Sequence, residues 1–256
     1  MSDGWAEGDV AVLVRAGEAP RVVRLRPTPQ AVGGSAVLDL SAELGRAPGG
    51  TVAWLGRQYR LVRPSLSDLL GGLERGPQIV TPKDAFHLAF LAGAVPGASV
   101  AEAGSGSGAL TVVLATLVGR EGRVASYDRR PEFLDAARRN VERSGLLDRV
   151  AFRLRDVAVE GLPGEPVHGV VLDLPEPWSV LRSAREALAT GGSLATYTPT
   201  YNQLERTVRA LRDERFEEVR ALELIERPIH VGDGGTRPEF EMLGHTGFLA
   251  AGRKVD

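Results

Sequence analysis

The stretch Ser99-Val-Ala-Glu-Ala-Gly-Ser-Gly-Ser-Gly-Ala-Leu-Thr111 decides the fold of this chain. An apolar run that predicts a buried strand leads into Glu102, and three alternating glycines then precede an apolar helix. Glycine adopts positive φ and lets a ligand approach the backbone closely, and a helix N-terminus presents unpaired N–H groups. The pattern also satisfies the dinucleotide fingerprint G-x-G-x-x-G/A. We therefore expect a strand–loop–helix turn that binds a nucleotide-like cofactor; a tight turn without a ligand is the alternative.

From about residue 78 onward, strand-like segments alternate with helix-like segments. Such alternation predicts a mostly parallel sheet with helices on both faces. Ligands then bind outside the carboxyl ends of the strands, where the strand order reverses. Only a Gly/Pro-rich segment separates the last two strands, which favours their antiparallel pairing. The expected strands are 98–103, 122–127, 150–154, 167–174, 192–198, 217–226 and 244–252, and the expected helices are 82–94, 108–118, 131–144, 178–189 and 202–213.

The first part of the chain has a different pattern. Short β-rich runs alternate with turns that carry Gly and Pro, which predicts a small β-domain over residues 1–70. Ser65 is placed to cap a short helix that follows it. Gly71-Gly72 and Gly76-Pro77 mark a linker. We therefore expect a second domain over residues 71–256 that contains the glycine-rich turn.

A second motif, Val170-Val-Leu-Asp-Leu-Pro-Glu-Pro-Trp178, also ends a buried strand in polar residues. A buried carboxylate is costly without a partner, so Asp173 at the strand end indicates a ligand. Pro175 and Pro177 stiffen the loop, and Trp178 offers a flat surface for stacking. These features indicate a base pocket with an acceptor for an exocyclic amine. The alternative is a helix start with Pro177 in its first turn and Trp178 in the core.

Acidic residues near the glycines favour S-adenosylmethionine (SAM) over NAD as the cofactor. Glu102 suits a cationic ammonium or sulfonium group better than a pyrophosphate. Asp128 lies about twenty residues beyond the glycines, where a carboxylate binds ribose hydroxyls. Asp156 follows the third strand of the alternating region and is placed to accept a hydrogen bond from the adenine amino group of the cofactor; a solvated loop aspartate is the alternative.

Composition restricts the remaining function classes. The chain has no cysteine, which excludes disulfides and thiolate nucleophiles, and its four histidines show no metal-ligand spacing. Its net charge of −2 gives no global electrostatic case for nucleic-acid binding. The N-terminus has no signal-peptide pattern, and no apolar run approaches the ~18 residues that span a bilayer. We expect a cytoplasmic protein that uses neither metal nor membrane.

Five motifs along the chain together resemble, in the same order, those of the tRNA (adenine-N1)-methyltransferases that act at position 58. They are Gln78-Ile-Val-Thr-Pro-Lys-Asp84, Glu102-Ala-Gly-Ser-Gly-Ser-Gly-Ala-Leu110, Ser126-Tyr-Asp128, Leu172-Asp-Leu-Pro-Glu-Pro-Trp178 and Gly244-His-Thr-Gly-Phe248. The resemblance implies a Rossmann-like class I SAM-dependent methyltransferase fold with a small N-terminal β-domain that contacts tRNA or neighbouring subunits. It also implies a homotetramer without a metal.

The resemblance also implies the site residues. Asp173 would face the target adenine as a catalytic residue, with Tyr197 beside it; from the residues alone, Tyr197 is equally placed in the crevice, in the core or at the surface. Thr81 stands where the family often carries Tyr. The implied cofactor-binding residues are Gln78, Glu102, Gly104, Gly106, Ser107, Gly108, Ala109, Leu110, Asp128, Asp156 and Asp173.

The expected function is transfer of a methyl group from SAM to N1 of adenine 58 in the T-loop of tRNA. Three alternatives stay open on the sequence. They are a SAM-dependent methyltransferase acting on another RNA, a protein or a small molecule; an NAD-linked dehydrogenase; and a non-catalytic RNA-binding subunit.

Overall fold

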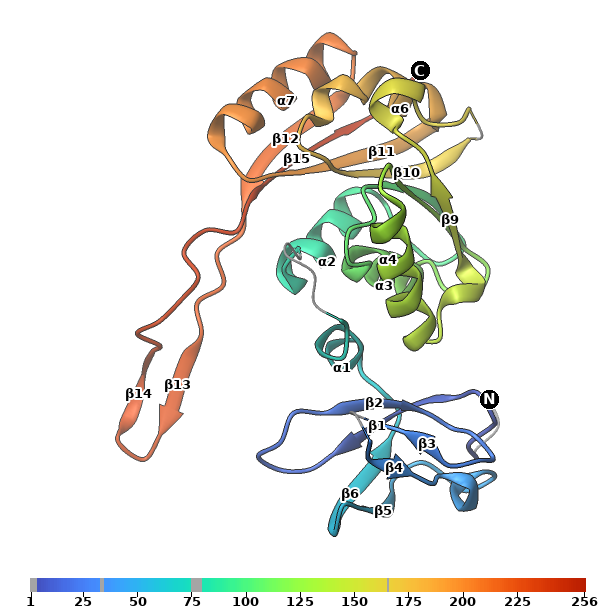
Figure 1. Cartoon of the computed structure of the whole chain (residues 1–256). Coiled ribbons are helices and arrows are strands. Elements are labelled where there is room, and N and C mark those ends of the chain that lie inside the picture. Colours follow the sequence, from blue (N-terminus) through green and yellow to red (C-terminus); the bar gives the residue numbers. More distant parts are fainter. Residues whose placement is uncertain (1–3, 33–34, 75–79, 165) are drawn as a thin grey trace.

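The computed structural model describes residues 4–32, 35–74, 80–164 and 166–256 (Figure 1). Within these ranges the largest sheet has seven strands in the order β12-β15-β11-β10-β7-β8-β9. Its strands are β7 (Ser99–Ala103), β8 (Arg123–Asp128), β9 (Val150–Leu154), β10 (Val167–Asp173), β11 (Leu188–Thr198), β12 (Glu217–Glu223) and β15 (Phe248–Arg253). The strands from β9 to β11 pair in parallel, and β15 pairs antiparallel with both β11 and β12. The antiparallel pairing expected for the last two strands is confirmed.

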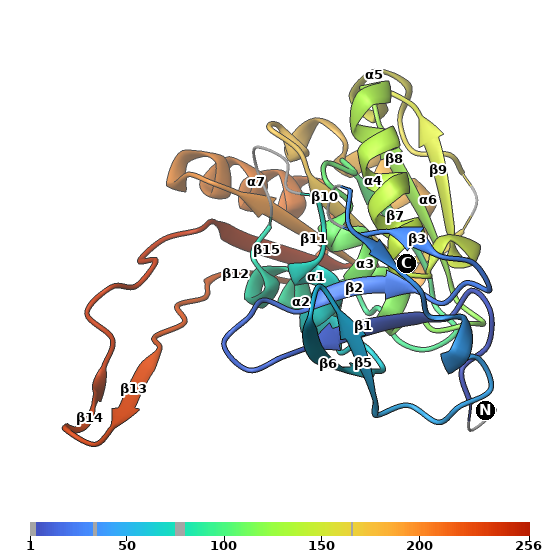
Figure 2. The same ribbon diagram turned by 60° about the horizontal axis from the view of Figure 1, so that its bottom comes forward.

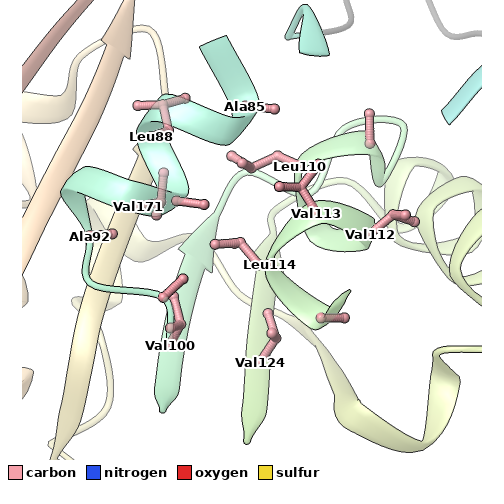
Figure 3. Close-up of a cluster of buried hydrophobic side chains, with 14 of the residues drawn as sticks. Ala85, Leu88, Ala92, Val100, Leu110, Val112, Val113, Leu114, Val124 and Val171 are labelled. Carbon is pink, nitrogen blue, oxygen red and sulfur yellow. The ribbon is translucent and has the colours of Figure 1, made fainter. Parts of the chain in front are cut away.

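Helices cover both faces of this sheet, as predicted (Figure 1). The helices are α2 (Pro82–Leu91), α3 (Ala109–Leu117), α4 (Pro131–Arg143), α5 (Val157–Glu160), α6 (Leu181–Ala187) and α7 (Tyr201–Asp213). One core holds α2 and α3 against the sheet, with Leu88, Leu114 and Val171 fully buried (Figure 3). A second core on the opposite face includes Leu181 of α6 and Leu211 of α7. Burial of these apolar faces stabilises the layers at roughly 25 cal/mol per Å² removed from water.

The strand order reverses beside β7. From β7 the chain proceeds outward through β8 to β9, and then crosses back to β10 on the other side of β7. The carboxyl ends of β7 and β10 therefore meet at the topological switch point, where α/β sheets bind ligands, and we call this place the crevice. In the parallel register Glu102 is level with Ser126 and Val171, and Asp173 is level with Tyr197. Side chains at these level positions point to the same face of the sheet, which is the face covered by α2 and α3.

A separate antiparallel sheet precedes the linker, and its described strands run in the order β2-β1-β6-β5. They are β1 (Val10–Val14), β2 (Arg21–Arg24), β5 (Gly50–Trp54) and β6 (Arg57–Val62); a small pair, β3 (Gln30–Ala31) and β4 (Val37–Leu38), lies beside them. The sheet has its own core, which includes Trp5, Leu25 and Leu61. Ser65 caps α1 (Leu66–Gly71) through a reciprocal capping box with Asp68, which confirms the expected helix start.

Apolar packing and a hydrogen bond hold the N-terminal sheet against the large domain, in addition to the covalent linker. Leu69 of α1 lies in the core beneath α3, and Val10 and Val22 of the N-terminal sheet pack against that same core. The guanidinium of Arg24 donates a hydrogen bond to the Glu142 carbonyl at the end of α4. The N-terminal sheet therefore packs against the layer of α1, α3 and α4, on the same side of the large sheet as these helices (Figures 1 and 2).

An extended arm leaves the sheet between β12 and β15. It comprises residues 224–247 and ends in the hairpin of β13 (Ile229–Gly232) and β14 (Gly235–Pro238), which stands away from the body (Figures 1 and 2). Apolar side chains along it are exposed, including Val231 at 75% and Phe240 at 84%. The sequence predicts no strand within this Gly/Pro-rich segment, yet residues 229–238 form a hairpin. Asp233-Gly234 forms the two-residue turn, and Asp-Gly between short strands is a strong hairpin signal.

Other element boundaries also differ from the prediction. The helix expected over 178–189 is two pieces, a 3₁₀ turn over Pro177–Ser179 and α6, because Pro177 starts a tight turn and the chain restarts after Val180. The helix expected to reach residue 94 ends at Leu91. The strand expected from residue 192 begins at Leu188. None of these differences moves the ends of β7 and β10.

Close packing of β10 on α2 gives a prediction for stability. A Cβ atom at Gly169 would lie 2.2 Å from the Ala92 carbonyl oxygen, which is backbone and has no room to retreat. Gly169→Ala should therefore lower the free energy of unfolding by about 1–3 kcal/mol, as overpacking does. Urea denaturation measures this value. Gly71→Ala is the matched control, because no atom lies within 4 Å of its added Cβ; equal effects of the two substitutions would contradict the prediction.

Candidate active site

The glycine-rich turn has the geometry that its sequence predicts. Gly106 (φ 52°) and Gly108 (φ 81°) adopt left-handed backbone conformations, which glycine enters without strain. A Cβ atom at Gly108 would lie 2.9 Å from the Cα atom of Ala137, so α4 also requires glycine there. At Gly106 nothing lies within 4 Å of such an atom. The turn thus packs closely on α4 and leaves open space at Gly106, where α3 begins just beyond it with Ala109 and Leu110 buried.

Gly104 brings the two sequence motifs together. Its N–H donates a hydrogen bond to the Asp173 carbonyl oxygen at 3.4 Å. A Cβ atom at Gly104 would lie 3.2 Å from Oδ2 of Asp128 and 3.4 Å from that same carbonyl. A Cβ atom at this position would require the Asp128 carboxylate to shift by a few tenths of an ångström. The glycine-rich turn and the Asp173 strand end therefore touch each other at the switch point.

Asp128, the last residue of β8, is held toward the glycine-rich turn. Its Oδ2 accepts a hydrogen bond from the Gly106 N–H at 3.3 Å, and its Oδ1 accepts one from the Arg130 N–H at 3.0 Å. The carboxylate is 7% exposed. These bonds orient the carboxylate toward the glycine-rich turn, and its binding of ribose hydroxyls stays a prediction.

Glu102 is fully buried on β7, the strand that pairs with β8. Its Oε2 accepts hydrogen bonds from the hydroxyls of Thr111 and Ser126, both at 2.6 Å, and its Oε1 has no partner among the described residues. Burial raises the pKa of Glu102 to about 8, and the nearby charges of Asp173 and Asp128 add to the rise. A cation in the crevice would lower the cost of keeping this group ionised.

Asp173 and Tyr197 lie side by side at the ends of β10 and β11. Burial raises the pKa of Asp173 to about 6, with a contribution from Asp128. No side chain or backbone group of the described residues donates a hydrogen bond to the Asp173 carboxylate, so its acceptor capacity is free for a ligand. The Tyr197 hydroxyl donates a hydrogen bond to the Thr246 carbonyl at 2.5 Å. Tyr197 is half-buried and also packs against the core that holds α2 and α3, so its role in the site stays a prediction.

For three further predicted residues, the structure gives no contact with the glycine-rich turn or with Asp173. Asp156 follows β9 and caps α5 by accepting a hydrogen bond from the Ala158 N–H at 3.1 Å, which leaves its Oδ2 at the surface, 3.9 Å from Arg129. The Arg206 guanidinium of α7 lies over the Trp178 ring, 4.2 Å from the ring centre, and so occupies one face of the ring. Gln78 lies outside the described residues.

A residue that was not predicted from the sequence also supports the site. Asn140 of α4 is fully buried, and its amide donates hydrogen bonds to the Ser107 carbonyl at 2.8 Å and the Glu74 carbonyl at 3.0 Å. It fixes the glycine-rich turn to the end of the linker. A signal existed, because Asn140 occupies the apolar stripe of α4 between Ala137 and Val141, where a polar residue needs a partner.

The crevice fits SAM better than a dinucleotide. Carboxyl groups of Glu102, Asp128 and Asp173 lie near one another there: besides burial, the charges of Asp173 and Asp128 raise the pKa of Glu102, and the charge of Asp128 raises that of Asp173. The Arg130 guanidinium lies close to them, with its Nε 3.7 Å from Oδ1 of Asp128, but the Arg130 side chain is half-exposed. Such a site repels a pyrophosphate and attracts a sulfonium or ammonium cation. In the described ranges, no cluster of three or more His, Asp or Glu side chains has the arrangement of a metal site.

Comparison with known proteins agrees with this geometry. A family model described as tRNA methyltransferase complex GCD14 subunit matches residues 71–237. The chain belongs to this family. The tRNA (adenine(58)-N(1))-methyltransferase TrmI of Thermus thermophilus is 39% identical over 83% of this chain and 84% of its own length. The tRNA (adenine(57)-N(1)/adenine(58)-N(1))-methyltransferase TrmI of Methanocaldococcus jannaschii is 35% identical over 77% of this chain and 79% of its own length.

Solved structures extend the family likeness to the whole chain. The tRNA (m1A58) methyltransferase TrmI of Aquifex aeolicus superposes with a TM-score of 0.74 at 28% identity, over 99% of both chains. A SAM-dependent O-methyltransferase from Thermotoga maritima gives a TM-score of 0.81 at 31% identity, over 99% of this chain and 96% of its own. The Rossmann-like methyltransferase fold expected from the sequence is confirmed. No helix in the described parts of the chain combines the length and apolar character needed to cross a bilayer.

The buried Glu102 gives a prediction for pH dependence. Because its pKa rises from 4.5 to about 8 on folding, the folded chain keeps a proton that the unfolded chain releases between these values. The free energy of unfolding therefore falls as the pH rises through this window. Glu102→Gln should reduce that fall by roughly 2 kcal/mol between pH 6 and 8 in urea denaturation without SAM. Glu7→Gln, which alters an exposed carboxylate, should keep the wild-type fall; the same fall in all three proteins would contradict the assignment.

Proposed function

We propose that this protein transfers a methyl group from SAM to N1 of adenine 58 in the T-loop of tRNA. The contact of Gly104 with Asp128 and Asp173 carries the proposal, because it joins the cofactor turn and the Asp173 strand end in one crevice. The family membership and the relatives that act on adenine 58 support the choice of substrate. The intact glycines and Asp173 favour a catalytic chain over a non-catalytic RNA-binding subunit.

The chemistry needs alignment more than proton transfer. SAM supplies the methyl group on a sulfonium, and adenine N1 has a free lone pair, so attack requires neither a general base nor a metal. Asp173 accepts a hydrogen bond from the adenine N6 amine as positive charge develops on the ring. Such a charge-assisted bond contributes about 1.5–3 kcal/mol, and exact positioning up to ~7–11 kcal/mol. The target base leaves its stack to reach the crevice, as in other base-modifying enzymes.

Residues 1–70 form the β-domain of this proposal and residues 71–256 the catalytic domain. The β-domain contacts tRNA or neighbouring subunits. Its exposed arginines, among them Arg26, Arg60 and Arg63, support tRNA contact because the guanidinium group binds phosphates in a bidentate manner. tRNA as the substrate supports a cytoplasmic location.

A homotetramer is the assembly we propose, and the arm of residues 224–247 supports self-association. A two-stranded hairpin is marginally stable alone, and exposed apolar side chains such as Val231 and Phe240 favour contact with another surface. Sedimentation equilibrium measures the assembly, and a monomer at micromolar concentration would contradict this part of the proposal.

The decisive experiment incubates the protein with unmodified tRNA and labelled SAM and then analyses the nucleosides. We expect 1-methyladenosine at position 58 and none in a tRNA with uridine at that position. Asp173→Ala should retain SAM binding but lower turnover about 10- to 150-fold, the rate equivalent of losing a charge-assisted hydrogen bond. Asp148→Ala, at the opposite end of the sheet, is the control because its carboxylate is largely exposed.

Two results would overturn the assignment. Label on a protein or a small acceptor, with none on tRNA, would give the chain a different substrate, such as the hydroxyl acceptor implied by the name of the Thermotoga protein. Wild-type turnover in Asp173→Ala would remove Asp173 from the mechanism.

The ribose assignment has its own test. Asp128→Ala removes an oriented carboxylate at the end of β8, so the SAM dissociation constant measured by calorimetry should rise at least about tenfold. tRNA affinity should stay within about twofold, because Asp128 is 7% exposed and lies inside the crevice. An unchanged SAM dissociation constant would show that Asp128 does not bind the cofactor.

A further inference from the structure

The hydrogen atom of the Tyr197 hydroxyl has a fixed recipient. It is donated to the Thr246 carbonyl oxygen at 2.5 Å, and a carbonyl only accepts. A phenol has one hydrogen, so the remaining capacity of the Tyr197 oxygen is as an acceptor. Burial raises the pKa of Tyr197 to about 12, with the charges of Asp84 and Asp173 contributing, so the hydroxyl keeps this hydrogen at working pH.

The Thr246 carbonyl is itself held in place. The Thr246 hydroxyl donates a hydrogen bond to Oδ2 of Asp84 at 2.6 Å and accepts one from Nζ of Lys83 at 2.7 Å. Asp84 is fully buried, and it also accepts hydrogen bonds from Thr81 and Lys83, both at 2.8 Å. The first turn of α2 therefore fixes the end of the arm, 162 residues further along the chain.

The Tyr197 ring is clamped from the same side. A Cβ atom at Gly247 would lie 2.3 Å from Cζ of Tyr197 and 2.6 Å from its hydroxyl oxygen. Only glycine lets the backbone approach the ring this closely, so the segment at Thr246 and Gly247 restricts both the ring and its hydroxyl. The neighbouring strand β10 carries Asp173, which is level with Tyr197. No described residue donates a hydrogen bond to the Asp173 carboxylate.

We propose that Tyr197 and Asp173 together form a double acceptor for the two N–H bonds of the exocyclic amine of the target base, and that Asp84 and Thr246 are positioning residues for Tyr197. This inference rests on the proposed function, which supplies adenine as the base. A base with a carbonyl at the same position, such as guanine, meets two acceptors and no donor and is rejected. Sites built around a substrate N–H discriminate strongly against analogues that lack it.

The test compares tRNA carrying adenine at position 58 with tRNA carrying purine ribonucleoside there, which has hydrogen in place of the amine. Tyr197→Phe should lower kcat/KM about 3- to 10-fold on the adenine substrate, the loss expected for one neutral hydrogen bond. It should change kcat/KM less than about twofold on the purine substrate, because no amine is present to lose its acceptor.

The outcomes separate this inference from the proposed function. Equal losses on the two substrates, or no loss on either, would overturn the acceptor role of Tyr197. Failure of the wild-type protein to methylate the adenine substrate would overturn the proposed function itself, and the double acceptor with it.

The positioning role is tested with Thr246→Val and Asp84→Asn. Thr246→Val keeps the carbonyl but loses the hydroxyl that fixes it, and Asp84→Asn keeps the shape but loses the charge. Both should lower the adenine-to-purine ratio of kcat/KM about 3- to 10-fold and leave the SAM dissociation constant unchanged. A merely structural defect would lower both rates together.

Thr116→Val is the matched control, because it removes a hydroxyl that donates to the Val112 carbonyl at 2.8 Å within α3. It should keep the wild-type ratio. A wild-type ratio in both Thr246→Val and Asp84→Asn would overturn the positioning role, as would equal losses on the two substrates. If one variant fails to fold, the ratio in the other decides.

Discussion

Carboxyl groups crowd the ends of adjacent strands, and the site depends on how that crowding is tolerated. Glu102 is fully buried, and Asp173 has no donor among the described residues. Glycine at position 104 permits the crowding, because the space a side chain would need is taken by Asp128 and by the backbone of β10. Burying like charges side by side is unfavourable, and a bound cation relieves it. The strand ends are therefore arranged for a positively charged ligand, at some cost to the stability of the chain without it.

Much of the fold follows from local sequence. The glycine-rich turn was predictable because glycines at 104, 106 and 108 between an apolar strand and an apolar helix have few other structural explanations. The choice of Asp173 as a candidate site residue had a related reason, since a carboxylate at the end of a wholly apolar strand needs a partner. The parallel sheet followed from the alternation of periods along the chain, and the antiparallel end from the missing helix before β15.

What the sequence could not supply depends on contacts between distant segments. Asp84 and Thr246 are remote in the chain, and neither has a local pattern that reveals the other. Trp178 illustrates the opposite error, because an aromatic ring beside a polar strand end resembles a stacking surface until Arg206 of α7 is found over it. The hairpin of the arm was missed for a different reason. Its Asp-Gly turn was visible, but exposed strands without a core lack the alternation that identifies most strands.

The acidic crevice also bears on what happens after transfer. The methyl group takes the positive charge of the sulfonium with it, so S-adenosylhomocysteine is neutral at sulfur while the methylated base is cationic. In the proposed reaction, the carboxylates of Asp128 and Asp173 would attract the neutral sulfur of the by-product less than the sulfonium of the donor. Exchange of the spent cofactor for fresh SAM would then follow from this difference in charge, without a separate release device.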